Sequence, residues 1–156
     1  YCLVSSAKKN DTRLIAVTLN SSSERTRITD NRRLLDYGFR YFITKIVVNA
    51  GEKLTEKEVW GGQVEKVSLA SATSLYLTLS PKDFKEVETF ISLDNYLQAP
   101  LVKGQVVGKI TLEIQGKEIA EAQLVTTQNI IAQGLFGRTW ANIKLLVYRF
   151  LMEDDK

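Results

Sequence analysis

Hydrophobic and polar residues alternate in short runs through the middle of the chain, and turn-forming residues interrupt them about every 8 to 12 residues. Alternation with a period of two is typical of strands that have one buried and one solvated face. Strands are predicted near residues 45–48, 52–60, 63–69, 75–79, 84–93, 106–114 and 117–125. Gln115 and Gly116 are predicted to form a two-residue hairpin turn, because glycine tolerates positive φ. The pattern predicts a small antiparallel β-sandwich over residues 43–130, and therefore a mainly β protein.

Residues 1–42 follow the pattern of a hairpin and a helix. Two apolar runs, 1–4 and 14–19, flank a turn at 9–11 and predict antiparallel strands. Both faces of these strands are apolar, so we expect them at the centre of a sheet that helices cover. A capping box at 21–24 begins a helix. Its apolar residues recur at helical spacing and are Ile28, Leu35, Phe39 and Phe42. One hairpin and one helix cannot cover both faces of such a sheet, so we expect the rest of this domain upstream.

The segment 135–152 predicts an amphipathic helix. On a wheel of about 100° per residue its apolar side chains share one broad face. They are Leu135, Phe136, Trp140, Ile143, Leu146, Val147, Phe150 and Leu151. The polar residues along the same segment are Arg138, Asn142, Lys144 and Arg149. Spanning a bilayer would bury cations at about 3 kcal/mol each, whereas a helix lying in the headgroup region lets the arginines meet lipid phosphates. We predict that 131–156 is a membrane anchor; a terminal helix packed on the protein's own core is the alternative.

Composition limits the partners of the protein. With 156 residues, 44% hydrophobic and 25% charged, the chain is globular and the size of one domain, or of a small domain with added pieces. A net charge of +3 is mild, and no basic run carries interleaved aromatic residues, so nucleic acid is not a predicted partner. Cys2 is the single cysteine, which excludes an internal disulfide and a cysteine-based zinc site. Its apolar surroundings predict a buried thiol.

The lack of histidine excludes several kinds of active site. A Ser-His-Asp triad, a Cys-His pair and the usual zinc ligand sets all need that residue. Glycine-rich phosphate-binding motifs are also missing from the sequence. Several carboxylates alternate with lysines and are predicted to be solvated strand faces; they are Glu52, Glu56, Glu58 and Glu65. We therefore predict no catalytic residue, metal or cofactor within this chain.

Five short strings together resemble a known family. They are 1–7 (YCLVSSA), 13–15 (RLI), 34–42 (LLDYGFRYF), 99–108 (APLVKGQVVG) and 135–138 (LFGR). In this order they resemble the C-terminal part of the low-molecular-mass penicillin-binding proteins, the bacterial serine D-alanyl-D-alanine carboxypeptidases. The resemblance covers essentially the whole chain but only the later part of a family member. It implies that 1–42 is the last hairpin and helix of a catalytic penicillin-binding domain, followed by a β-domain and a membrane anchor.

The resemblance also implies a function for the parent protein. Family members trim the terminal D-alanine from peptidoglycan pentapeptides through a serine acyl-enzyme that β-lactams also form. The implied location is peripheral, on the periplasmic face of the inner membrane and its anionic lipids, with the β-domain setting the height of the active site. The SxxK, SxN and KTG motifs of the family are missing here. Ser5 and Lys8 match SxxK by letter only, since they lie on a predicted strand. This chain alone is therefore expected to be inactive.

Arg27 is the candidate substrate-binding residue. By gap-free counting along the matching strings, it falls where the family has an arginine that helps hold the terminal carboxylate of the peptide. A guanidinium can pair with a carboxylate through two charge-assisted hydrogen bonds. Arg25 is its rival for this role, and a solvated position on the helix surface is the alternative for Arg27, as for Arg32 and Arg33.

A different class of function stays open, a non-enzymatic β-sandwich adaptor that binds a membrane and a protein partner. The two hypotheses differ in what precedes Tyr1. An upstream reading frame with SxxK, SxN and KTG would favour the carboxypeptidase, and a start codon close to Tyr1 would favour the adaptor.

Overall fold

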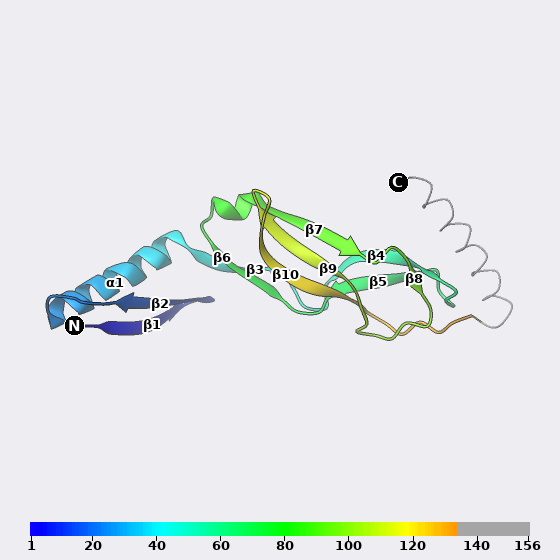
Figure 1. Ribbon diagram of the computed structural model, residues 1–156, viewed down its shortest axis with the longest axis horizontal. Helices are drawn as coiled ribbons and strands as arrows, with labels where there is room; N and C mark the ends of the chain where they lie inside the picture. Colours follow the sequence, from blue (N-terminus) through cyan, green and yellow to red (C-terminus); the bar gives the residue numbers. More distant parts are fainter. Residues whose placement is uncertain (134–156) are drawn as a thin grey trace. The chain divides into compact units, whose positions relative to one another are not determined.

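The computed structural model describes residues 1–133, so the predicted anchor helix at 135–152 lies outside the described residues (Figure 1). The elements in chain order are β1 (Leu3–Lys9), β2 (Thr12–Thr18), α1 (Glu24–Tyr41), β3 (Ile43–Val48), β4 (Lys53–Trp60), β5 (Lys66–Ser71), β6 (Leu75–Leu79), η1 (Asp83–Glu86), β7 (Val87–Leu93), β8 (Leu97–Gln98), β9 (Val106–Ile114) and β10 (Lys117–Thr126). They form two compact units. The first contains Tyr1–Val47, Tyr76–Glu88 and Ile114–Gly116, and the second contains Val48–Leu75, Thr89–Glu113 and the chain from Lys117.

The first unit begins with the hairpin of β1 and β2. Lys9 lies opposite Thr12, so Asn10 and Asp11 form the turn, and Asn10 has a φ of 52°. Asparagine adopts this left-handed conformation more readily than most residues. The predicted hairpin and the position of its turn are therefore confirmed.

The two faces of this hairpin differ in exposure. On the face toward α1, Ala16 is buried. On the opposite face, Val4, Ile15 and Val17 are 65%, 69% and 50% exposed. The structure thus has apolar side chains on both faces of the hairpin, as the sequence predicts, and α1 covers one of them. The expectation that an upstream part of the protein covers the other face stays a prediction.

The N-cap of helix α1 lies two residues after the first residue of the predicted capping box at 21–24. Ser23 is the N-cap, and its Oγ accepts a hydrogen bond from the backbone N–H of Thr26 at 3.1 Å. Ile28, the first of the apolar residues at helical spacing, is 54% exposed. The buried residues of α1 are Asn31 and Gly38. Neither residue belongs to the apolar pattern of the helix, because one has a polar side chain and the other has none.

Asn31 joins α1 to both strands of the hairpin. Its Nδ2 donates to the backbone oxygens of Leu3 at 3.3 Å and Ala16 at 3.1 Å, and its Oδ1 accepts a hydrogen bond from the Ser5 hydroxyl. The side chain is only 2% exposed, so these bonds satisfy a buried amide. Two turns further on, a Cβ at Gly38 would collide with the Leu14 side chain, so the helix and β2 approach closely there.

Strands β3 and β6 form a separate two-stranded sheet. The hydroxyls of Thr44 and Thr78 are 2.8 Å apart across it. The predicted strand at 84–93 is wrong at its start, where residues Asp83–Glu86 form the 3₁₀-helix η1. Ser80 favours this turn, because its Oγ accepts from the Asp83 N–H at 3.2 Å and donates to the Asp83 carboxylate at 2.8 Å.

The larger sheet has six strands in the order β7-β9-β10-β5-β4-β8. Strand β5 is antiparallel to both β4 and β10, as predicted for this region. The short β8, which the sequence pattern did not predict, pairs in parallel with β4 through Val59–Leu97 and Trp60–Gln98. This departs from a purely antiparallel arrangement, and it is possible because a long connection separates the two strands. The turn at Gln115 and Gly116 is confirmed, with φ angles of 52° and 74°.

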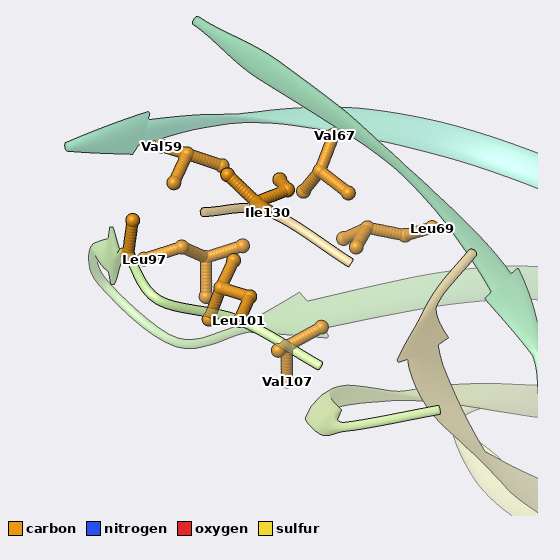
Figure 2. Packing of buried hydrophobic residues seen from close by; sticks show 8 residues of the cluster. Val59, Val67, Leu69, Leu97, Leu101, Val107 and Ile130 are labelled. Atoms are coloured by element: carbon orange, nitrogen blue, oxygen red, sulfur yellow. The ribbon is translucent and has the colours of Figure 1, made fainter. Parts of the chain in front are cut away.

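The core of the second unit lies among these strands. Leu69, Ile110, Leu112 and Leu124 are completely buried. One cluster brings together residues from strands and loops that are distant in sequence: Val59, Val67, Leu69, Leu97, Ala99, Leu101, Val107 and Ile130. Figure 2 shows seven of these side chains pointing toward a common interior. The predicted fold class, a mainly β domain preceded by a hairpin and a helix, is confirmed.

Replacing Asn31 should loosen the hairpin. Asn31→Ala leaves two backbone oxygens and the Ser5 hydroxyl without a buried partner, so we expect the opening free energy of β1 and β2 to fall by about 2–3 kcal/mol. Amide hydrogen exchange of the full chain measures this free energy strand by strand. Arg32→Ala is the control, because Arg32 is exposed and surface changes usually stay within about 0.5 kcal/mol. Equal protection of the hairpin in both variants would contradict the role assigned to Asn31.

Candidate functional site

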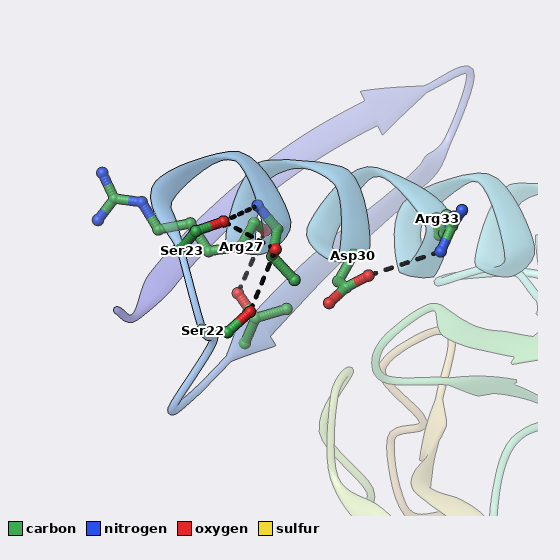
Figure 3. Close-up of polar contacts among 7 residues, drawn as sticks. Ser22, Ser23, Arg27, Asp30 and Arg33 are labelled. Carbon is green, nitrogen blue, oxygen red and sulfur yellow. Dashed lines mark hydrogen bonds and ion pairs between the residues drawn. The ribbon is translucent and has the colours of Figure 1, made fainter.

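Arg27 lies in the first turn of α1, against the residues that precede β1. Its Nη1 donates to the Cys2 carbonyl at 3.1 Å, and its Nη2 pairs with Glu24 Oε1 at 2.9 Å. The guanidinium carbon also lies 5.7 Å from the centroid of the Tyr1 ring, within range of a cation–π interaction. Figure 3 shows the Arg27 side chain directed away from Asp30 and Arg33. These contacts hold the guanidinium against the hairpin rather than in open solvent.

The other arginines of α1 have different surroundings. Arg32 and Arg33 make long ion pairs of 3.9 Å to Asp36 and 3.7 Å to Asp30, and their side chains are 84% and 77% exposed. Arg25 is also exposed. The Arg27 side chain is only 28% exposed. The structure therefore separates Arg27 from the helix-surface cations with which its sequence position could be confused.

The hydrogen bonds of Arg27 do not use all of its donors. Its Nε is buried and has no hydrogen-bond partner among the described residues. A guanidinium presents five N–H donors in a rigid plane, and an unpaired buried donor costs free energy. An acceptor with two oxygens, such as a carboxylate, has the geometry to use such a donor together with a neighbouring one. Glu24 already balances part of the positive charge from its exposed position.

Two polar residues that sequence analysis did not single out organise this site. Thr18 Oγ1 lies 3.4 Å from the Leu3 carbonyl and 3.5 Å from the Arg27 carbonyl, so it ties the end of β2 to both β1 and α1. Asn31 lies one turn after Arg27 on the hairpin side of the helix. In the sequence, each of them is a polar residue on an otherwise apolar face. Such a residue is predicted to be solvated unless its tertiary contacts are known.

Ser5 and Lys8 do not form a nucleophile and base. Residues three apart on a strand point to opposite faces, and both lie on β1. The Ser5 hydroxyl donates to Asn31 instead. This confirms that the SxxK match at this position is one of letters alone.

The sequence also made predictions for Cys2 and for four glutamates. The predicted burial of the Cys2 thiol is wrong; the residue is exposed, because it precedes β1 and is not part of a strand. The four glutamates predicted to be solvated are exposed, which confirms that prediction. They are Glu52, Glu56, Glu58 and Glu65. The pKa of the Glu56 carboxyl is lowered, chiefly by its hydrogen bond and charge interaction with Lys53.

The predicted membrane-binding residues lie outside the described part of the chain. They are Leu135, Phe136, Arg138, Trp140, Ile143, Lys144, Val147, Arg149 and Phe150. Within residues 1–133, no helix has the length and apolar character needed to cross a bilayer. In the same range, no group of three or more acidic, cysteine or histidine side chains is placed to hold a metal ion.

Comparison with known proteins identifies the family of the chain. Residues 42–131 match the family model described as penicillin-binding protein 5, C-terminal domain. The chain belongs to this family. The solved structure of penicillin binding protein 5 from Haemophilus influenzae is similar with a TM-score of 0.72 and 34% identity, covering 84% of this chain and 39% of that one.

Curated relatives extend the similarity into the hairpin and helix. D-alanyl-D-alanine carboxypeptidase DacC of Escherichia coli (strain K12) is 35% identical over 141 residues, which are 90% of this chain and 35% of the relative. DacA of Haemophilus influenzae is 36% identical over 149 residues, which are 94% of this chain and 38% of the relative. The chain thus spans little more than a third of the curated relatives that it matches.

Proposed function

We propose that this chain is the C-terminal segment of a serine D-alanyl-D-alanine carboxypeptidase. The parent would remove the terminal D-alanine from peptidoglycan pentapeptides through a serine acyl-enzyme that β-lactams also form. The observation that carries this proposal is the match to relatives named D-alanyl-D-alanine carboxypeptidase, which runs through 90% and 94% of the chain and is not limited to the C-terminal domain. A shared β-domain alone would be compatible with many functions.

The parts of the chain have separate roles in this proposal. Residues 1–42 complete the catalytic domain, the β-domain of 43–130 sets its distance from the membrane, and 131–156 anchors the protein. The exposed apolar face of the hairpin supports the first role, because Val4, Ile15 and Val17 lie where a larger sheet domain would bury them. The protein would work at the periplasmic face of the inner membrane, bound peripherally to anionic lipids.

Arg27 would bind the terminal carboxylate of the stem peptide. Its partial burial, its anchoring on the Cys2 carbonyl and its unpaired Nε support this role over that of a solvated cation. A carboxylate bound there would form charge-assisted hydrogen bonds with the guanidinium, and these are stronger in a partly desolvated position than in water.

The first test concerns catalysis by the chain itself. Because the SxxK, SxN and KTG motifs are missing from its sequence, the purified chain should neither hydrolyse a D-Ala-D-Ala peptide nor become labelled by a fluorescent penicillin. The native parent, isolated from cells with an antibody to this chain, should be labelled once per molecule. Stoichiometric labelling of the chain itself, or an unlabelled parent, would contradict the proposal.

The second test concerns Arg27 in the intact parent. Arg27→Ala should lower kcat/KM by roughly 10- to 150-fold, which corresponds to about 1.5–3 kcal/mol for a lost hydrogen bond to a charged group. The Arg25→Ala variant is the matched control and should stay near wild type, since Arg25 is exposed. Steady-state hydrolysis of a D-Ala-D-Ala peptide measures both.

A second substrate separates binding from a merely structural effect. A peptide with an amidated C-terminus lacks the carboxylate, so Arg27→Ala should change its low rate of turnover much less than that of the acid. Equal losses for acid and amide would assign Arg27 a structural role. An impaired Arg25→Ala beside an unchanged Arg27→Ala would move carboxylate binding to Arg25.

The third test concerns the anchor. Trp140→Glu with Phe150→Glu places two charges on the predicted apolar face, so the chain should no longer sediment with anionic liposomes. Asn142→Glu with Lys144→Glu changes the polar residues of the same segment and is the control; it should weaken binding by the electrostatic contribution only. Binding of the unaltered chain should weaken with salt but persist, because the apolar contribution is not screened. A chain that ignores anionic liposomes at low salt would contradict the anchor.

A further inference from the structure

Strand β7 is a long end strand of the six-stranded sheet. It hydrogen-bonds to β9 on one side, and no other strand of the described residues pairs with its other side. β8, at the opposite end of the sheet, has only two residues, whereas β7 has seven. A short edge strand offers little backbone for pairing, so β7 is the edge at which this sheet could be extended.

The side chains of β7 leave this edge unprotected. All residues from Glu88 to Ser92 are exposed, so both faces of the strand are accessible. Two of them are large and apolar, Phe90 at 47% and Ile91 at 40% exposure. Edge strands are commonly protected by lysine, proline or a bulge, but the one charged residue of β7 is Glu88, and its sequence has no lysine or proline.

The C-terminal end of β7 is held closely against its neighbour. A Cβ added at Gly108 of β9 would collide with the Ser92 carbonyl oxygen and lie 3.0 Å from the Leu93 Cα. The N–H of Asp94 donates to the Val107 carbonyl at 3.0 Å just beyond the strand. The backbone N–H and C=O groups on the free side of β7 are therefore already held in place. Pairing with another strand would cost little of their conformational entropy.

We propose that β7 pairs antiparallel with β7 of a second copy of this chain, around a two-fold axis at Phe90. The axis is perpendicular to the joined sheet, so it keeps each side chain on its own face. It must therefore lie between one residue and the same residue of the second copy, which are directly opposite each other. Centring the pair on Phe90 uses the whole strand. Centring it on Thr89 or Ile91 would leave Ser92 and Leu93, or Val87 and Glu88, unpaired.

The strand is complementary to itself in this register. Phe90 lies beside Phe90 of the second copy, and Glu88 lies opposite Ser92. Cross-strand aromatic pairs are favourable, and like charges placed directly opposite are unfavourable. A parallel arrangement in register would put the two Glu88 side chains beside each other. Charge and residue type therefore favour a second copy in the antiparallel, Phe90-centred register.

Disulfide trapping in the full chain tests the pairing. In a Cys2→Ser background, which removes the single native thiol, Phe90→Cys places two cysteines directly opposite each other. Opposed residues in antiparallel strands have Cβ atoms about 4.5–5.5 Å apart, close enough for a disulfide after a small adjustment. Val102→Cys is the control, because Val102 is 62% exposed but lies outside β7. Phe90→Cys should form covalent dimer at least about 10-fold faster, since paired thiols reach millimolar effective concentrations.

The register is tested by two further variants. Glu88→Cys and Ser92→Cys should cross-link when mixed, but each should cross-link poorly with itself. In the chain without engineered cysteines, Phe90→Lys should shift the equilibrium toward monomer in sedimentation velocity, while Val102→Lys should not. The proposal is overturned if Phe90→Cys dimerises no faster than Val102→Cys, or if Glu88→Cys alone cross-links as fast as the mixture. Covering of the β7 edge by another segment or another protein would give the first of these results.

Discussion

Burial of apolar side chains in the six-stranded sheet is the constraint on which the second unit depends. Leu69, Ile110, Leu112 and Leu124 come from three strands and are fully buried. Because successive side chains of a strand point to opposite faces, burying these four fixes the register of each strand. In β10, for example, a slip by one residue would turn Leu124 to the face that carries the exposed Gln123, at a cost of about 2 kcal/mol. The turns adapt to this requirement, as the positive φ angles at Gln115 and Gly116 illustrate.

The first unit is organised differently, around a buried amide. Asn31 bonds to the backbone of both hairpin strands, and Gly38 lets α1 approach β2. Arg27 lies four residues before Asn31, so it is on the same side of the helix. The Asn31 hydrogen bonds that orient the helix thus also place the Arg27 guanidinium against the Cys2 carbonyl. The contacts that hold the helix to the hairpin therefore also position the candidate binding residue.

The same alternation that builds the core also leaves a free edge. In the middle of β9, residues 110–112 are buried on both faces, while its neighbour β7 is exposed over most of its length. The partly buried Leu93 at the end of β7 packs against the apolar cluster of the second unit, whereas Phe90 and Ile91 are exposed to solvent. The other end of the sheet is different, because the edge strand there, β8, has only two residues.

The sequence by itself determined the class of fold, the hairpin with its turn at Asn10, and most strands, because alternation and turn residues are local properties. Its family resemblance also singled out Arg27. It could not determine that Asn31 is buried while Ile28 is exposed, since hydrophobic periodicity assigns a polar residue to solvent unless distant backbone oxygens satisfy it. Nor could it predict the parallel pairing of β8 with β4, or the hydrogen bond from the Arg27 guanidinium to the Cys2 carbonyl. These features depend on contacts between residues far apart in the chain, which only the tertiary structure brings together.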